Sequence, residues 1–161
     1  MTLSKNDWKP IQEFSNLKSF VNNYPNKNSP RFEYYLPRDI SEDAALQDLV
    51  SGNIYPAELV RVTNEKIAAE TAQLIKERGV GNPNASYFAE EVIKTIQNKI
   101  NKNYSDVKER ILVINADECV PFSWVDKWQP VITYAMKAPF HAVYAIQHNM
   151  EKTDILELKK C

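Results

Sequence analysis

The sequence has few of the residues on which cofactor loops and disulfide scaffolds depend. Only three of its 161 residues are glycine, and only two, Cys119 and Cys161, are cysteine. Phosphate-binding loops place closely spaced glycines before a helix, whereas Gly79 and Gly81 follow a predicted helix and resemble a C-cap. We therefore expect no nucleotide cofactor. Two cysteines do not suggest a disulfide framework, and they indicate a reducing cytoplasm as the location.

Long apolar runs and a charge excess are also missing from the sequence. No stretch approaches the roughly 20 apolar residues of a membrane span, and residues 1–8 lack the apolar core of a secretory signal. Lys and Arg total 20 against 21 for Asp and Glu, although nucleic-acid-binding domains usually carry a basic excess. We expect no membrane association. A protein partner is favoured, with nucleic acid kept as an alternative.

Three short runs of apolar, often β-branched residues indicate the fold class. They occupy Glu58–Thr63, Arg110–Ala116 and Phe140–Gln147, and the stretches between them are long enough for helices. This alternation is typical of parallel strands joined by covering helices. We predict that the whole chain is one α/β domain, with an N-terminal helical segment (1–29) and an α/β core (30–161). The predicted sheet is mixed, mostly parallel, has four or five strands and is flanked by helices.

The remaining segments add predicted elements around this sheet. A helix over Tyr87–Tyr104 is the clearest, because apolar residues recur there every four positions. A turn at Asn149-Met150 separates the third strand from a weaker one, which predicts a C-terminal β-hairpin at one sheet edge. Further strands are expected at Arg31–Leu36 and Asp154–Leu158, and further helices around residues 14–21, Ser41–Val50, Asn64–Arg78 and 122–136.

Polar residues follow two predicted strands at the ends where open α/β sheets bind ligands. Asp117 and Glu118 come after the second strand, and His148 comes after the third. The two acids have oxygen ligands for a divalent cation and can also act as acid and base. His148 is a candidate catalytic histidine. The alternative interpretation is that all three are solvated loop residues.

Two further sets of side chains have both a chemical and a plain structural interpretation. Lys99 and Lys102 lie on the predicted helix Tyr87–Tyr104, where they either contact phosphate groups or belong to a solvated helix face. Cys119 is either a nucleophile or a small packed residue. Neither histidine, His141 nor His148, can be placed beside it from the sequence.

Four segments between Glu58 and Gln147 follow one another in a recognisable order: Arg61-Val-Thr63, Ile93–Tyr104, Ile111–Ala116 and Phe140–Tyr144. This order resembles the restriction-endonuclease-like PD-(D/E)XK superfamily, especially its small divergent members. There, a strand ending in a Glu-Val-Thr-like triplet leads into a helix. A helix rich in Ile and Lys, a Leu-Leu-Val-Ile strand, another helix and a Phe-x-x-Val-Tyr strand come later.

The resemblance implies a metal site that this sequence does not reproduce. The family holds a metal ion with two acids and a lysine, but Arg61 stands at the position of the second acid and Thr63 at that of the lysine. Upstream, Arg31 stands where an aspartate is expected. A cation in such a place repels a divalent metal. We predict instead that Arg61 pairs with an acid of a neighbouring element and fills the space of the metal.

Two functions follow as alternatives. The first is a non-catalytic binding or interaction protein, such as a degenerate nuclease-like domain or an inhibitor of a protein partner, which needs no cofactor. Its candidate binding residues are Arg61, Asp117, Glu118, His148, Lys99 and Lys102. The second is a metal-dependent nuclease with an acidic site rebuilt from Glu33, Asp39 and Glu58, which requires Mg²⁺.

Overall fold

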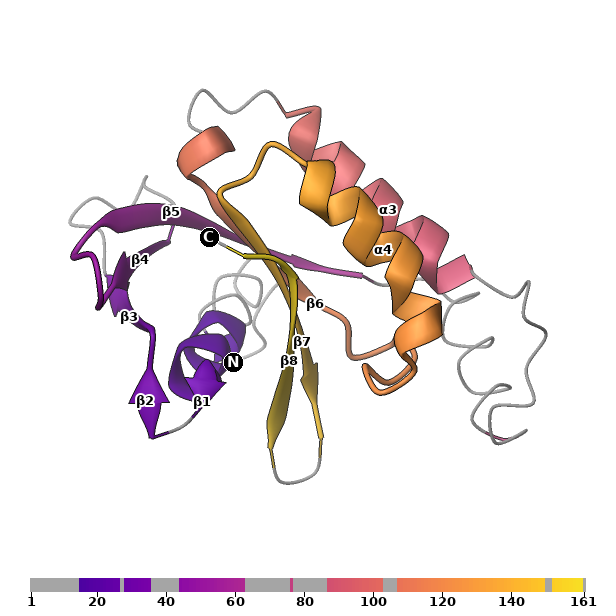
Figure 1. Cartoon of the computed structure of the whole chain (residues 1–161), viewed down its shortest axis with the longest axis horizontal. Coiled ribbons are helices and arrows are strands. Elements are labelled where there is room, and N and C mark those ends of the chain that lie inside the picture. Colours follow the sequence, from indigo (N-terminus) through magenta and orange to yellow (C-terminus); the bar gives the residue numbers. More distant parts are fainter. Residues whose placement is uncertain are drawn as a thin grey trace, which may run out of the picture.

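A six-stranded mixed sheet forms the centre of the protein in a computed structural model (Figure 1). The structure describes residues 15–26, 28–35, 44–62, 76, 87–102, 107–149 and 152–160. The strands follow chain order from one edge of the sheet to the other: β3 (Phe32–Tyr35), β4 (Ala45–Asp48), β5 (Ile54–Arg61), β6 (Ile111–Asn115), β7 (Ala142–His148) and β8 (Thr153–Lys159). The other described elements are a helix over 15–23, the short strands β1 (Pro25–Asn26) and β2 (Ser29–Pro30), α3 (Tyr87–Ile100), the 3₁₀ turn η1 (Val107–Glu109) and α4 (Val125–Lys137).

The strand directions confirm an α/β fold with a mixed sheet. β5, β6 and β7 run parallel, whereas β3 with β4, β4 with β5, and β7 with β8 are antiparallel pairs. The expectation of four or five strands in a mostly parallel sheet is therefore wrong. The C-terminal β-hairpin is present, and its turn is closed by the N–H of Asn149, which donates to the carbonyl of Lys152.

The additional strand is β4, which lies where the sequence suggested a helix over Ser41–Val50. Residues of β4 alternate between half-buried and buried, the period of a strand, with Leu46 in the core. Pairing with β3 and β5 satisfies its backbone groups. A segment this short holds too few helical turns for its apolar pattern to separate helix from strand. Pairing with β4 also explains why β5 begins at Ile54 rather than Glu58.

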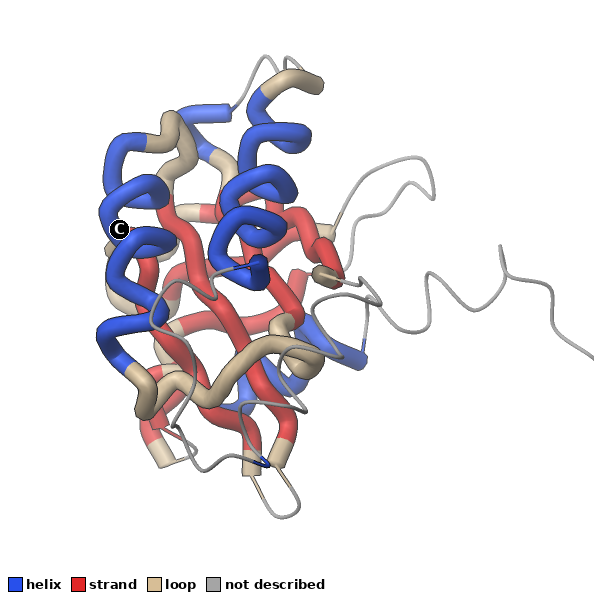
Figure 2. The backbone as a smooth tube through the Cα atoms, turned by 90° about the vertical axis from the view of Figure 1, so that its right-hand side faces the viewer, coloured by secondary structure: helices blue, strands red, loops and turns tan. Residues whose placement is uncertain are grey.

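Helices cover both faces of the sheet, and each face has its own core (Figures 1 and 2). α3 and α4 lie side by side on one face, and the helix over 15–23 lies on the other. The expected apolar stripe of α3 is confirmed, since Phe88, Val92 and Ile96 are fully buried against the sheet. α4 continues through Pro130. No helix among the described residues is long and apolar enough to cross a bilayer. The helix expected at Asn64–Arg78 lies outside the described residues except for Lys76.

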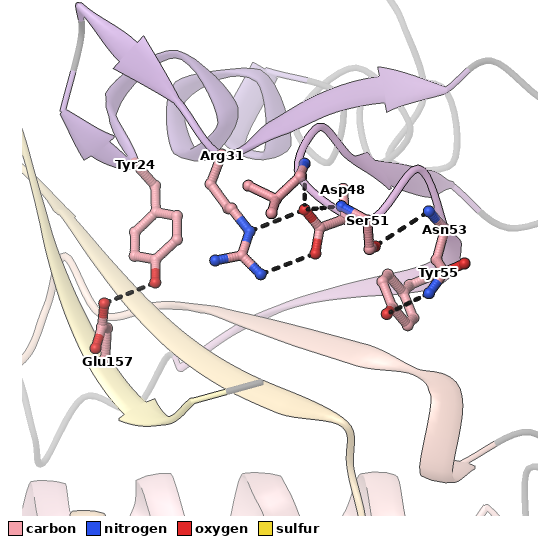
Figure 3. Close-up of polar contacts among 8 residues, drawn as sticks. Tyr24, Arg31, Asp48, Ser51, Asn53, Tyr55 and Glu157 are labelled. Atoms are coloured by element: carbon pink, nitrogen blue, oxygen red, sulfur yellow. Dashed lines mark hydrogen bonds and ion pairs between the residues drawn. The ribbon is translucent and has the colours of Figure 1, made fainter.

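A nearly buried ion pair fixes the turn between β4 and β5 (Figure 3). The guanidinium of Arg31 donates two hydrogen bonds of 2.9 Å to the two carboxylate oxygens of Asp48, whose side chain is only 3% exposed. The backbone N–H groups of Val50 and Ser51 donate to the same carboxylate. The hydrogen bond from Arg31, together with these backbone donors, lowers the pKa of Asp48 to about 2.

Asp48 should therefore make the stability of the fold depend on pH. Its pKa is lower in the folded than in the unfolded chain, so its contribution is complete above about pH 4 and is lost as pH falls towards 2. We expect Asp48→Asn to lower the free energy of unfolding at pH 6 by about 1–3 kcal/mol, and the difference from wild type to shrink at pH 2.5. Urea unfolding at both pH values measures this. Glu33→Gln, at an exposed carboxyl on β3, is the control and should show a much smaller loss at pH 6.

Candidate functional site

The three parallel strands change from apolar to polar side chains at one edge of the sheet. On the face covered by the helix over 15–23, β5 ends with Arg61, β6 with Asn115 and β7 with His148. The residues two positions earlier on the same face belong to the core: Leu59, Val113 and Ile146. These are the carboxyl ends of parallel strands, where open α/β sheets bind ligands. We call Arg61, Asn115 and His148 the polar row.

Asp117 and His148, both expected as site residues, are brought together by this edge. The backbone N–H of His148 donates to Asp117 Oδ1 at 2.7 Å, and His148 Nδ1 lies 3.0 Å from Asp117 Oδ2. The side chain of His148 is 32% exposed and that of Asp117 is 28% exposed. A pair this exposed adds little stability, but it orients the imidazole, with Nδ1 towards the carboxylate and Nε2 away from it.

A chain of hydrogen bonds holds Asp117 in position. The side-chain oxygen of Asn115 accepts from the backbone N–H of Asp117 at 3.0 Å, and Asn115 Nδ2 donates to Asn16 Oδ1 at 3.0 Å. Asn16 comes from the helix over 15–23, so elements far apart in the sequence meet at this edge. Asn115 is only 3% exposed, and buried amides are retained where their hydrogen bonds are satisfied.

Gln147 fixes the loop that carries Asp117. Its Nε2 lies within hydrogen-bond distance of three backbone carbonyl oxygens of this loop, those of Ala116 (3.0 Å), Cys119 (3.3 Å) and Val120 (2.8 Å). The indole N–H of Trp128 on α4 also donates to the carbonyl of Val120. The loop after β6 is therefore tied to both β7 and α4.

The ion pair predicted for Arg61 is not found among the described residues. Its side chain is exposed, and it makes no ion pair or hydrogen bond with another side chain in the part of the chain that the structure describes. Arg61 is the last residue of β5, at the end of the strand, where its side chain is exposed. The acid partner predicted for Arg61 is not found among the described residues, and the guanidinium lies at the polar row.

Glu58 has the ion pairs that were expected for Arg61. It lies on the opposite face of β5, where Oε1 is 2.7 Å from Nζ of Lys99 on α3 and Oε2 is 3.2 Å from Nη1 of Arg110. All three side chains are at most 17% exposed. Lys99, a candidate phosphate contact, is therefore engaged by a carboxylate. Lys102 is exposed in the turn after α3 and belongs to neither the polar row nor the Glu58 cluster.

The acids proposed for a rebuilt nuclease site are not brought together. Glu33 is exposed on β3 beside a surface groove of about 630 Å³, and Asp39 lies outside the described residues. The register places Glu33 opposite Gln47, which pairs with Ile54, four residues before Glu58. Two strand spacings of about 4.8 Å and four residues of about 3.3 Å each therefore separate Glu33 from Glu58. Their Cα atoms are about 16 Å apart. No group of three potential metal-ligating side chains occurs among the described residues.

The remaining candidates have structural roles. Burial raises the pKa of Cys119 to about 12, and the neighbouring acids Glu118 and Asp117 act in the same direction. Cys119 is 4% exposed, so it is a packed residue rather than a nucleophile. Glu118 is half-buried in the same turn. At the opposite end of β7, His141 stacks on Tyr55 with ring centroids 4.3 Å apart, and burial lowers its pKa.

Three residues that shape these sites are not among the predicted site residues. Asn115, Gln147 and Arg110 are buried polar residues at the ends of apolar strands, with exposures of 3%, 7% and 6%. Each interrupts or borders an otherwise apolar run, and a polar residue in such a place is the sequence pattern that indicates a buried, hydrogen-bonded side chain. Their partners come from distant elements and could not be read from the sequence.

No protein-family model, curated protein or solved structure matches the chain. The chemistry of the polar row therefore has to be inferred from its own residues. Those residues supply an exposed guanidinium and an oriented imidazole, which act as hydrogen-bond donors, whereas the buried amide of Asn115 is engaged with Asn16 and Asp117.

Replacing Gln147 should loosen the loop that carries Asp117. Gln147→Leu removes the Nε2 donor from three carbonyl oxygens, of which that of Val120 keeps the indole N–H of Trp128 and that of Ala116 keeps the N–H of Cys119. This loss should lower the free energy of unfolding by about 1–3 kcal/mol. It should also speed amide hydrogen exchange in residues 116–120. Asn98→Leu removes a side-chain amide from an exposed position of α3. It is the control and should change neither quantity appreciably. Equal exchange rates in the two variants would contradict the role given to Gln147.

Arg61→Ala should leave the fold almost unchanged, because the side chain is exposed. We expect the free energy of unfolding to change by less than about 0.5 kcal/mol, measured by denaturant titration. A loss of about 3–5 kcal/mol would instead indicate a buried ion pair and would contradict the exposed position of Arg61.

Proposed function

We propose that the chain is a non-catalytic binding domain with a nuclease-like arrangement of elements. The described succession β5, α3, β6, α4 and β7 supports the resemblance, because it follows the order expected for the restriction-endonuclease-like superfamily, apart from the helix expected directly after the first strand, which lies outside the described residues except for Lys76. The three strands run parallel and lie side by side. Fold alone does not determine activity, so the proposal depends on the residues at the expected metal position.

The observation that carries this proposal is the neutralisation of Glu58 by two cations. Lys99 and Arg110 occupy both oxygens of its carboxylate at 2.7 and 3.2 Å. A divalent metal there would have to displace them or bind beside two positive charges, which electrostatic repulsion opposes. At the end of the same strand, Arg61 adds a third cation where the family has an acid.

The alternative is a metal-dependent nuclease built from Glu33, Asp39 and Glu58. The separation of about 16 Å between the first and last of these acids disfavours it, because one metal ion binds its oxygen ligands within about 2–2.6 Å. A protein partner is favoured over a nucleic acid by the near-neutral charge of the chain. Exposed apolar side chains at the β4–β5 turn, Leu49, Val50 and Ile54, also support a protein partner.

Incubation with plasmid DNA and with RNA tests the proposal directly. We expect no cleavage with Mg²⁺ or Mn²⁺ beyond that seen with EDTA. Glu58→Gln is the decisive variant, because it leaves the size of the side chain unchanged. Metal-dependent cleavage by the wild-type chain that disappears in Glu58→Gln would overturn the proposal in favour of the nuclease.

The sign of a stability change separates the two roles of Glu58 without an activity assay. If Glu58 serves to pair Lys99 and Arg110, Glu58→Gln should lower the free energy of unfolding by about 1–3 kcal/mol. If Glu58 is instead a metal ligand, it lies among other carboxylates that repel it when the metal is absent. Glu58→Gln removes this repulsion and should leave the free energy of unfolding equal or higher. Urea unfolding in EDTA measures the difference, with Glu33→Gln as the exposed control.

A further inference from the structure

The polar row gathers hydrogen-bond donors from three strands on one face of the sheet. Arg61 pairs in register with Asn115, and Asn115 with Ile146, so Arg61 and Ile146 are separated by two strand spacings, about 10 Å. His148 lies two residues, about 7 Å, beyond Ile146 on the same face. The guanidinium and the imidazole extend from neighbouring parts of one edge, with the amide of Asn115 between them.

The charges at this edge favour an anion. Arg61 carries a permanent positive charge and has no carboxylate partner among the described residues. Asp117 is the acid that contacts His148, and its carboxylate accepts from the backbone N–H of His148 and lies against Nδ1 of the ring. The exposed guanidinium of Arg61 repels metal ions and attracts anions.

The geometry of the donors indicates which anion. A guanidinium forms paired hydrogen bonds with the oxygens of a carboxylate or a phosphate. A phosphate carries more oxygens than a carboxylate and holds them in a tetrahedral arrangement, so it can accept from the guanidinium and also from a donor on a second strand, His148 Nε2. Asp117 holds the ring by Nδ1, so Nε2 is directed away from the carboxylate, and no hydrogen bond to Nε2 is present among the described residues.

We propose that Arg61 and His148 form a binding site for a phosphate group at the carboxyl edge of β5–β7. This inference deepens the proposed binding function and rests on it, since the phosphate would be carried by the bound partner or by a small ligand. Asn115 and Gln147 are positioning residues of this site. They hold Asp117, and Asp117 holds the imidazole.

Nuclear magnetic resonance offers a test with an internal control, because the chain contains only two histidines. The full chain is titrated with inorganic phosphate at fixed pH while both imidazoles are observed. The His148 signals should shift in a saturable way, and those of His141, at the other end of β7, should not. Arg61→Ala should weaken phosphate binding at least about tenfold, the loss expected for one paired charged hydrogen bond.

Lys160→Ala removes an equally positive side chain that is 80% exposed beyond β8, and it should change binding less than about twofold. Comparison of a phosphoserine peptide with the unphosphorylated peptide and with inorganic phosphate shows whether the phosphate is carried by a protein partner or by a small ligand. The inference is overturned if Arg61→Ala and Lys160→Ala weaken binding equally, if both histidines shift together, or if acetate binds as well as phosphate. Metal-dependent cleavage, in contrast, would overturn the proposed function whether or not phosphate binds.

Discussion

The burial of β6 on both faces is the constraint on which the rest of the structure depends. All five of its residues are buried, and they alternate between the two cores. A strand of this kind needs a neighbour on each side and a covering layer on each face. β5 and β7 supply the neighbours in parallel, which requires long connections between strands. α3 and α4 cover one face and the helix over 15–23 the other.

This burial confines polar chemistry to the two ends of the parallel strands. At the amino end, Arg110 turns towards Glu58, and His141 packs against Tyr55 in a position where burial lowers the pKa of the imidazole. These groups are engaged within the fold. At the carboxyl end, Arg61 and His148 extend past the core. The asymmetry between the ends follows from the covering helix over 15–23, which meets the sheet at Asn115 through Asn16.

The strands and helices around β6 could be predicted because their signals are local. The β-branched run at Ile111–Asn115 and the apolar stripe of α3 each reflect burial that repeats along a single segment. β4 could not be predicted, because only its partners β3 and β5 make its short sequence a strand. The strand count was too low for the same reason, since antiparallel strands that pair at the edges have weak patterns of their own.

For the site residues, too, position along a strand could be predicted from local sequence, whereas partners from distant elements could not. The rule that ligands bind at the carboxyl ends of parallel strands selected Asp117 and His148 as separate candidates at the ends of two strands, and it could not reveal that the two side chains contact each other. The ion pairs that the structure describes on β5 belong to Glu58, whereas the sequence predicted one for Arg61. Glu58 and Arg61 point to opposite faces, and only the position of α3 and Arg110 decides which face holds the opposite charges. Such pairings join residues about 40–50 positions apart, beyond any local pattern.

The arrangement of charge along β5 reverses that of a metal site. A metal site gathers carboxylates at the ligand-binding edge and keeps cations near enough to assist. Here the carboxylate of Glu58 is withdrawn under α3 and paired with two cations, whereas the guanidinium of Arg61 is left at the edge. Because the two residues are on opposite faces of one strand, neither neutralises the other. The strand therefore combines an internal ion-pair cluster that stabilises the packing of α3 with an external positive group suited to anions.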